Sequence, residues 1–243
     1  MKNRAYIPHP ATLLLVATLM LVLLSWIGSV NDWPVQNMLS AEGLRLTLRH
    51  AMAHVHRSPL IPVLILSMAV SLTCTSGLLK ALLQQMRAWG GRGYLSHKRQ
   101  RALQLATLTF IIYMVCVAVA TFSPFAILLG VTGTLNRSPF VDGIVPIVSL
   151  AFILPGILFG IASGEFRNDR EVLTGMCRLP IALMDYFIYL LVASLFLGTL
   201  QSSLLDAFMG IGERGVRWIG YVLYYVPLIG KLLNLLHENK LCD

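Results

Sequence analysis

The chain has 243 residues, of which 56% are hydrophobic and only 12% are charged. Soluble globular domains carry about 25% charged residues, so this composition excludes a soluble globular protein. The net charge of +8 does not indicate nucleic acid binding, because the lysines and arginines lie between apolar runs, where they orient membrane helices. We expect an all-α polytopic membrane protein in which residues 1–243 form a single integral membrane domain.

The apolar runs predict five or six transmembrane helices, since crossing a bilayer core takes about 20 apolar residues. The first run exceeds the apolar region of a secretory signal and no A-x-A site follows it, so we expect an uncleaved span. The predicted spans are 11–30, 60–83, 103–131, 143–162, 179–200 and 216–236. The last one contains Arg217, Lys231 and Pro227, which leaves open whether it crosses the membrane, re-enters it or lies at the interface.

The loop charges predict the orientation, because cytoplasmic loops retain lysine and arginine. The densest basic cluster follows the second span, whereas the loop after the third span contains only Arg137. The members of the cluster are Lys80, Arg87, Arg92, Lys98, Arg99 and Arg101. The loop with this cluster is therefore expected in the cytoplasm, and the N-terminus with it.

The segment from Leu39 to His56 intersperses leucines with arginines and histidines after a helix-capping Ser40, which predicts an amphipathic helix on the outer surface. His50 and His54 have a spacing found in metal sites, but no carboxylate or cysteine nearby completes a ligand set. The four cysteines have no close pair, so neither a zinc site nor a disulfide framework is expected. We expect no metal and no other cofactor.

Polar groups at membrane depth are the candidate functional residues, because they are costly in lipid. Asp185, six residues into the fifth predicted span, is either a proton or cation relay or an interfacial acid paired with Arg178 or water. We favour the interfacial acid. Small polar residues of the second span would line a transport path or allow close helix packing, and we favour packing. They are Ser71, Thr73, Thr75 and Ser76.

Gly156, Gly160 and Gly164 recur at the spacing of close contacts between membrane helices, so we expect them to pack against a neighbouring helix. The sequence contains no nucleophile elbow, P-loop, H-E-x-x-H motif or dinucleotide fingerprint. No nucleophile with an adjacent base can be named within the predicted spans either. We therefore expect that the protein is not an enzyme.

Several blocks of the sequence occur in the order in which a known transporter family has them. They are Ile7-Pro8-His9-Pro10-Ala11-Thr12, Leu39-Ser40-Ala41-Glu42-Gly43-Leu44-Arg45, Pro59-Leu60 through Ser76-Gly77-Leu78, and Ser138-Pro139-Phe140 through Ile144-Val145-Pro146 and Leu154-Pro155-Gly156 to Asp169, Val172, Met176 and Tyr186. Together they resemble the AbgT family, the aminobenzoyl-glutamate transporters of bacterial inner membranes. The resemblance implies a multi-pass inner-membrane protein and proton-coupled transport of aminobenzoyl-glutamate or related small anionic solutes.

The chain also departs from the pattern of this family. Its transporters are longer and bind substrate at re-entrant hairpins, neither of which can be placed here. The stretch between Leu83 and Ser138 is too short for the first hairpin, and Cys74 and Thr75 stand where the family has an acidic residue. The alternative function is a non-transporting scaffold or accessory subunit. The expected partners are the lipid bilayer and either a second copy, forming a homodimer, or another membrane protein.

Overall fold

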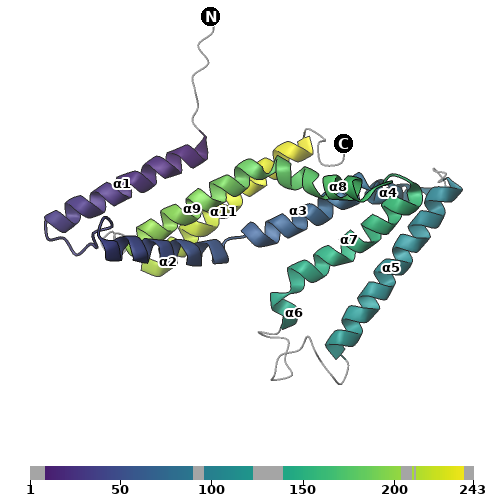
Figure 1. Ribbon diagram of the computed structural model, residues 1–243, viewed down its shortest axis with the longest axis horizontal. Helices are drawn as coiled ribbons and strands as arrows, with labels where there is room; N and C mark the ends of the chain where they lie inside the picture. The colour runs from purple at the N-terminus through teal and green to yellow at the C-terminus, as the bar shows by residue number, and fades with distance from the viewer. Residues whose placement is uncertain (1–8, 90–95, 123–138, 204–209, 211, 238–243) are drawn as a thin grey trace, which may run out of the picture. The chain divides into compact units, whose positions relative to one another are not determined.

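A computed structural model describes residues 9–89, 96–122, 139–203, 210 and 212–237, and every regular element within these ranges is a helix (Figure 1). Six stretches of these residues are long and apolar enough to cross a membrane. They are Pro10–Val30, Ala41–Thr75, His97–Phe122, Ile144–Ser163, Met184–Ser202 and Arg214–Leu235. The prediction of an all-α polytopic membrane protein is confirmed, and the doubtful sixth predicted span is long and apolar enough to cross.

The second predicted span, 60–83, is wrong in its extent. Helix α3 (Leu60–Thr75) ends before a turn, and α4 (Leu78–Trp89) begins after it. Gly77 lies in this turn with a φ of +76°, a conformation that favours glycine because it has no Cβ. Apolar residues resume at Leu78 directly after the turn, so the window of about 20 residues used for spans did not locate the break.

The fifth predicted span, 179–200, also begins in the wrong place. Its first residues belong to α8 (Asp169–Ala182), and α9 (Met184–Ser202) is a separate helix. Asp185 consequently lies in the first turn of α9. The third predicted span corresponds to α5 (His97–Phe122), and its residues 123–131 lie outside the described residues.

Contacts divide the chain into two compact units, one of Met1–Ile61 with Leu183–Asn234 and one of Pro62–Ala182 with Leu235–Asp243. The first unit contains α1 (Pro10–Val30), α2 (Ala41–Arg57), α9 and most of α11 (Gly212–His237). The second contains most of α3, together with α4, α5, α6 (Pro139–Asp142), α7 (Ile144–Ser163) and α8. The single membrane domain stays a prediction.

In the first unit, α2 packs antiparallel against α9 without large side chains between them. A Cβ added at Gly198 of α9 would lie 2.6 Å from the amide nitrogen of Ala51 in α2. The hydroxyls of Thr47 and Ser202 are 3.3 Å apart across the same contact. Leu44 and Leu48 of α2 stay exposed, so this helix turns its small residues toward the protein and its leucines away from it.

The connection from α1 to α2 is fixed by hydrogen bonds to its backbone groups. The fully buried Ser25 hydroxyl of α1 donates to the Gln36 carbonyl and accepts from the Met38 amide at 3.1 Å. The Gln36 amide donates to the Ser203 carbonyl at the end of α9 at 3.2 Å. Helices α1 and α2 are thereby both joined to α9.

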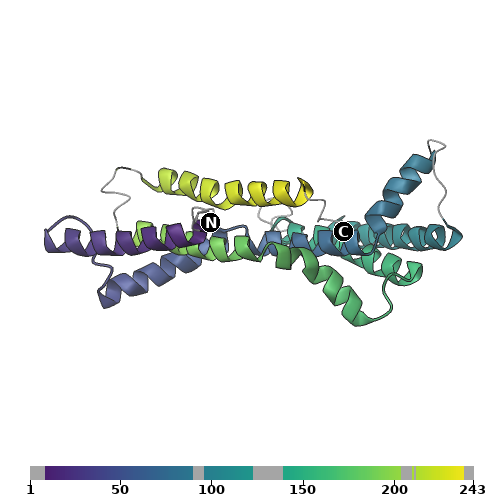
Figure 2. The same ribbon diagram turned by 90° about the horizontal axis from the view of Figure 1, so that it is seen from above.

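Helix α11 runs along α9 in the opposite direction (Figures 1 and 2). Near the start of α9, the Tyr186 hydroxyl donates to the Tyr224 carbonyl at 2.9 Å. Nearer its end, a Cβ added at Gly220 of α11 would lie 3.3 Å from Leu197. Helix α9 therefore contacts α1, α2 and α11.

In the second unit, α5 and α7 lie side by side (Figure 1). The Tyr113 hydroxyl of α5 donates to the Ile147 carbonyl of α7 at 2.9 Å, and Arg99 pairs with Glu165 at 2.9 Å. A cluster of buried side chains joins α4 to both helices. Its members are Leu78, Ala81, Ala102, Leu103, Ala106 and Phe159.

We predict that Gly198→Leu lowers the unfolding temperature of the detergent-solubilised protein. The new side chain would overlap the backbone and the Cβ of Ala51, and overpacking of this kind costs about 1–3 kcal/mol. The matched control is Gly230→Leu, because a Cβ at Gly230 of α11 meets nothing within 4 Å. Equal unfolding temperatures for the two variants would contradict the close contact of α2 with α9.

Candidate functional site

Ser71 joins α3 to α8. Its buried hydroxyl donates to the Gly175 carbonyl at 2.5 Å and accepts from the Leu179 amide at 3.0 Å. A regular α-helix would bond the Leu179 amide to that same carbonyl, so the hydroxyl enters the hydrogen-bond ladder of α8. Gly175 permits the approach, since a Cβ there would lie 2.7 Å from the Thr75 hydroxyl oxygen.

The other three hydroxyls predicted for α3 bond to their own chain segment. Thr73 donates to the carbonyls of Ala69 and Val70, as small hydroxyl residues commonly do in helices. Thr75 donates to the Ser71 carbonyl, and Ser76 donates to the Thr73 carbonyl. Each of the four therefore has a backbone acceptor, and Ser71 and Thr75 meet α8.

The three glycines of α7 have three different surroundings. A Cβ added at Gly156 would make ordinary contact with Leu72 of α3, at 3.6 Å. One added at Gly160 would overlap the ring of Phe166, which follows α7 in the chain. Gly164 ends α7 with a φ of +85°. Gly156 therefore faces α3, and a Cβ added at Gly164 would lie 2.9 Å from the Lys98 Nζ of α5.

Asp185 pairs with Lys231 rather than with Arg178. The Lys231 Nζ donates to the Asp185 Oδ2 at 3.0 Å, which ties the start of α9 to the last part of α11. The lysine side chain is 34% exposed and the aspartate 65%. The pair therefore lies at the surface of the first unit.

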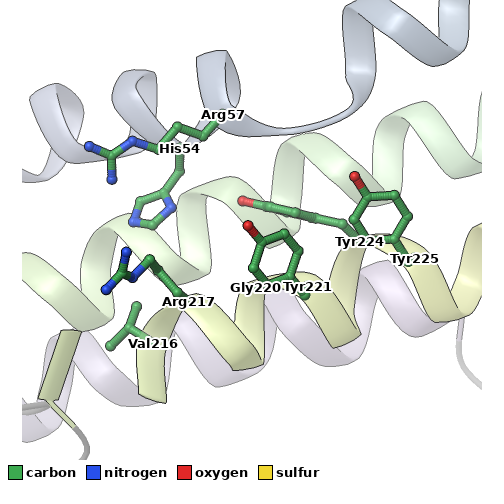
Figure 3. A pocket seen from close by; sticks show the side chains of 8 residues that line it. All are labelled: His54, Arg57, Val216, Arg217, Gly220, Tyr221, Tyr224 and Tyr225. Atoms are coloured by element: carbon green, nitrogen blue, oxygen red, sulfur yellow. The ribbon is translucent and has the colours of Figure 1, made fainter. Parts of the chain in front are cut away.

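Figure 3 shows a pocket of about 270 Å³ in the first unit that the sequence did not predict. Two basic residues come from the end of α2, and an arginine with three tyrosines comes from α11. They are His54, Arg57, Arg217, Tyr221, Tyr224 and Tyr225. An adjoining hollow of about 300 Å³ shares His54, Arg57 and Arg217 and adds Gln201 of α9.

Local sequence accounts for the position of both sides of this pocket. His54 and Arg57 occupy the last turn of α2, where positive charge is favourable to the helix dipole. Arg217, Tyr221 and Tyr224 follow at intervals of four and three, so they share one face of α11. This spacing could have predicted the α11 side of the pocket from the sequence. No local pattern in the sequence links that side to α2.

The pocket is cationic among the residues that the structure describes. The described ion pairs include neither Arg57 nor Arg217, so neither guanidinium has a described carboxylate within 4.0 Å. His54 is buried, and its Nε2 lies 2.9 Å from the Gln201 Oε1, which holds the ring in place. The arrangement can attract an anion, and its tyrosines offer aromatic faces beside the charge.

The remaining candidates are metal ligands and cysteines. Within the described ranges, no three His, Cys, Asp or Glu residues lie close enough to hold a metal ion. Cys116 and Cys177 are free and exposed. Cys74 of α3 is disulfide-bonded, which the sequence did not predict.

Comparison with known proteins identifies the family. The sequence pattern of the AbgT putative transporter family matches residues 90–218, which is more than half of the chain. The chain belongs to the AbgT family. The predicted resemblance is thereby confirmed, and membership of a transporter family agrees with a multi-pass membrane protein that is not an enzyme. A search of curated proteins finds no match.

Two solved AbgT-family structures share the fold. The YdaH transporter of Alcanivorax borkumensis, described as having an unusual topology, aligns with a TM-score of 0.69 and 18% identity, over 88% of this chain and 74% of that one. MtrF of Neisseria gonorrhoeae, described as illuminating a class of antimetabolite efflux pumps, aligns with a TM-score of 0.65 and 17% identity, over 90% and 76%. At these identities the likeness establishes the fold alone.

We predict that Ser71→Ala destabilises the protein by roughly 1–3 kcal/mol, because the Leu179 amide loses its hydroxyl acceptor in a buried contact. Thr73→Ala is the matched control, since Thr73 bonds only within α3. Thermal unfolding in detergent measures both variants. A Ser71→Ala protein of unchanged stability but reduced solute flux would instead place Ser71 on a transport path.

Proposed function

We propose that the chain is a proton-coupled AbgT-family transporter of aminobenzoyl-glutamate-like or related small anionic solutes. The observation that carries the proposal is the Asp185–Lys231 pair, which joins two helices long and apolar enough to span a membrane. Family membership supports the transport activity. The anionic substrate class is supported by the cationic pocket of the first unit.

The pair is suited to coupling because its strength depends on the charge of one carboxylate. An ionised Asp185 holds Lys231 through a charge-assisted hydrogen bond, and protonation removes the opposite charge. Loss of this bond weakens one of the attachments of α11 to α9. Asp185 lies in the first turn of α9, and an ionisable group this near the end of a span can reach the membrane interface, where protons have access to it.

The proposed location is the bacterial inner membrane, with the N-terminus in the cytoplasm. Counting spans from that end, α9 begins and α11 ends on the cytoplasmic side. The Asp185–Lys231 pair then lies on that side, and the pocket beside His54 lies toward the outer side. The arrangement exposes the pair to the pH of the cytoplasm.

A second candidate is a membrane scaffold or accessory subunit without transport activity. The observation that favours it is the role of Ser71, whose hydroxyl is fully engaged between α3 and α8 instead of facing a solute. A scaffold would act as a homodimer or with another membrane protein. Its mass in nanodiscs would then exceed that of one chain, or a pull-down would recover a partner.

We predict that Asp185→Asn lowers pH-gradient-driven uptake of aminobenzoyl-glutamate into proteoliposomes at least tenfold. The variant keeps the size of the side chain but cannot change charge. Asp169→Asn is the matched control, because Asp169 is an exposed acid of α8 without an ion pair among the described residues. We expect uptake by wild type and by Asp169→Asn, and loss of uptake only in Asp185→Asn.

The reversed pair Asp185→Lys with Lys231→Asp separates coupling from simple stability. It restores the ion pair, so the unfolding temperature should return toward that of wild type. Uptake that is equally pH-dependent in Asp185→Asn and wild type would refute the coupling role. A correctly inserted wild-type protein without flux of any such solute would favour the scaffold.

A further inference from the structure

We propose that the pocket lined by α2 and α11 is a binding site for an oxyanion group, carboxylate or phosphate, attached to a small apolar or aromatic body. Arg57 and Arg217 would hold the oxyanion, and the tyrosines of α11 would contact the apolar part. The inference deepens the proposed function and rests on it for the anionic solute, whose acidic group it assigns to this pocket. The binding itself requires neither transport nor the Asp185–Lys231 pair.

The first argument is the unbalanced charge. In Figure 3 the imidazole of His54 lies between the guanidinium groups of Arg57 and Arg217. Neither guanidinium has a carboxylate partner among the described residues. Guanidinium groups bind carboxylate and phosphate through paired N–H donors, so two of them at one pocket favour such a group over a neutral ligand.

The second argument is the hydroxyl of Tyr224. The residue is only 5% exposed, and its hydroxyl, near that of Ser194, makes no hydrogen bond of ordinary geometry with the described residues. Figure 3 shows this hydroxyl on the side of the pocket that faces His54. Buried hydroxyls nearly always have a partner, so this one is a spare donor just behind the wall of the pocket.

The third argument is the aromatic wall. The rings of Tyr221 and Tyr225 stack with centroids 6.2 Å apart and an angle of 24° between their planes. Flat aromatic faces beside a cationic end match a ligand with one ring and one charge. A volume of about 270 Å³ has room for a single ring with its acidic group, but it is small for a large solute.

The pocket is anchored to the rigid part of the unit. The buried His54 ring is held by Gln201, and Gly220 brings α11 close to Leu197. Arg57 and Arg217 themselves are exposed, so they can rearrange around a ligand. The guanidinium groups therefore lie at the outer side of the pocket, where an oxyanion can reach them.

An oxyanion of this kind comes either from a free aromatic acid or from the headgroup of an anionic lipid. The experiment uses the purified full-length protein and three probes. Benzoate tests the aromatic acid, benzamide tests the same shape without charge, and nanodiscs with or without phosphatidylglycerol test the lipid. Binding is measured by calorimetry for the first two and by native mass spectrometry for retained lipid, so a transport failure does not affect the readout.

We expect Arg57→Gln and Arg217→Gln each to weaken binding of the probe roughly 10- to 100-fold, the usual effect of losing a charged hydrogen bond. Tyr224→Phe should weaken it less. Arg45→Gln is the matched control, since Arg45 is an exposed arginine of α2 that does not line the pocket. Unfolding temperatures confirm that each variant is folded, and Arg217→Lys should retain part of the affinity.

Each outcome decides the proposal. If wild type binds benzoate but not benzamide, and the arginine variants lose benzoate binding, the ligand is a free aromatic acid. If wild type retains phosphatidylglycerol in native mass spectrometry and the same variants lose it, the ligand is a lipid headgroup. Two results would overturn the oxyanion site. In the first, wild type binds neither benzoate nor phosphatidylglycerol. In the second, the double variant Arg57→Gln with Arg217→Gln binds both of them as well as wild type does.

Discussion

The close approach of α2 to α9 at Gly198 is the contact on which the first unit depends. With only a hydrogen at this position, the α2 backbone can lie directly on α9, and its last turn is then held where His54 reaches Gln201. Helix α11 is placed by the same α9, through Tyr186 at one end and Leu197 nearer the other. The pocket exists because α2 and α11 are positioned independently on one common helix.

Hydroxyl groups supply much of the remaining specificity, and the membrane explains why. Lipid tails are as apolar as leucine, so burying apolar surface does not drive these helices together. Ser25, Ser71 and Ser202 are fully buried and reach across to another segment. A methyl group would fill much the same space but would remove a hydrogen-bond partner from a polar group of the neighbouring segment, which is costly in a medium without water.

The sequence predicted what depends on composition and local periodicity, namely the helical class and the approximate spans. It misplaced the boundaries at Gly77 and Leu183, because each break is a local backbone event with apolar residues on both sides. It missed the pocket for a different reason. Arg217 was interpreted as an obstacle to membrane crossing, and only the tertiary contact with α2 shows that His54 and Arg57 lie beside it.

The two proposed sites lie at opposite ends of one antiparallel helix pair. Asp185 and Lys231 fasten the start of α9 to the end of α11, while Arg217 lies near the start of α11, beside the end of α9. An anion at the pocket and a proton on Asp185 would both act on the position of α11 against α9. Coupling between binding sites is reciprocal, so a proton that changes anion affinity implies an anion that changes proton affinity by the same factor. Helix α11 is fastened to α9 through Lys231 near its end and carries Arg217, unpaired among the described residues, near its start, so it is the element that would carry this coupling.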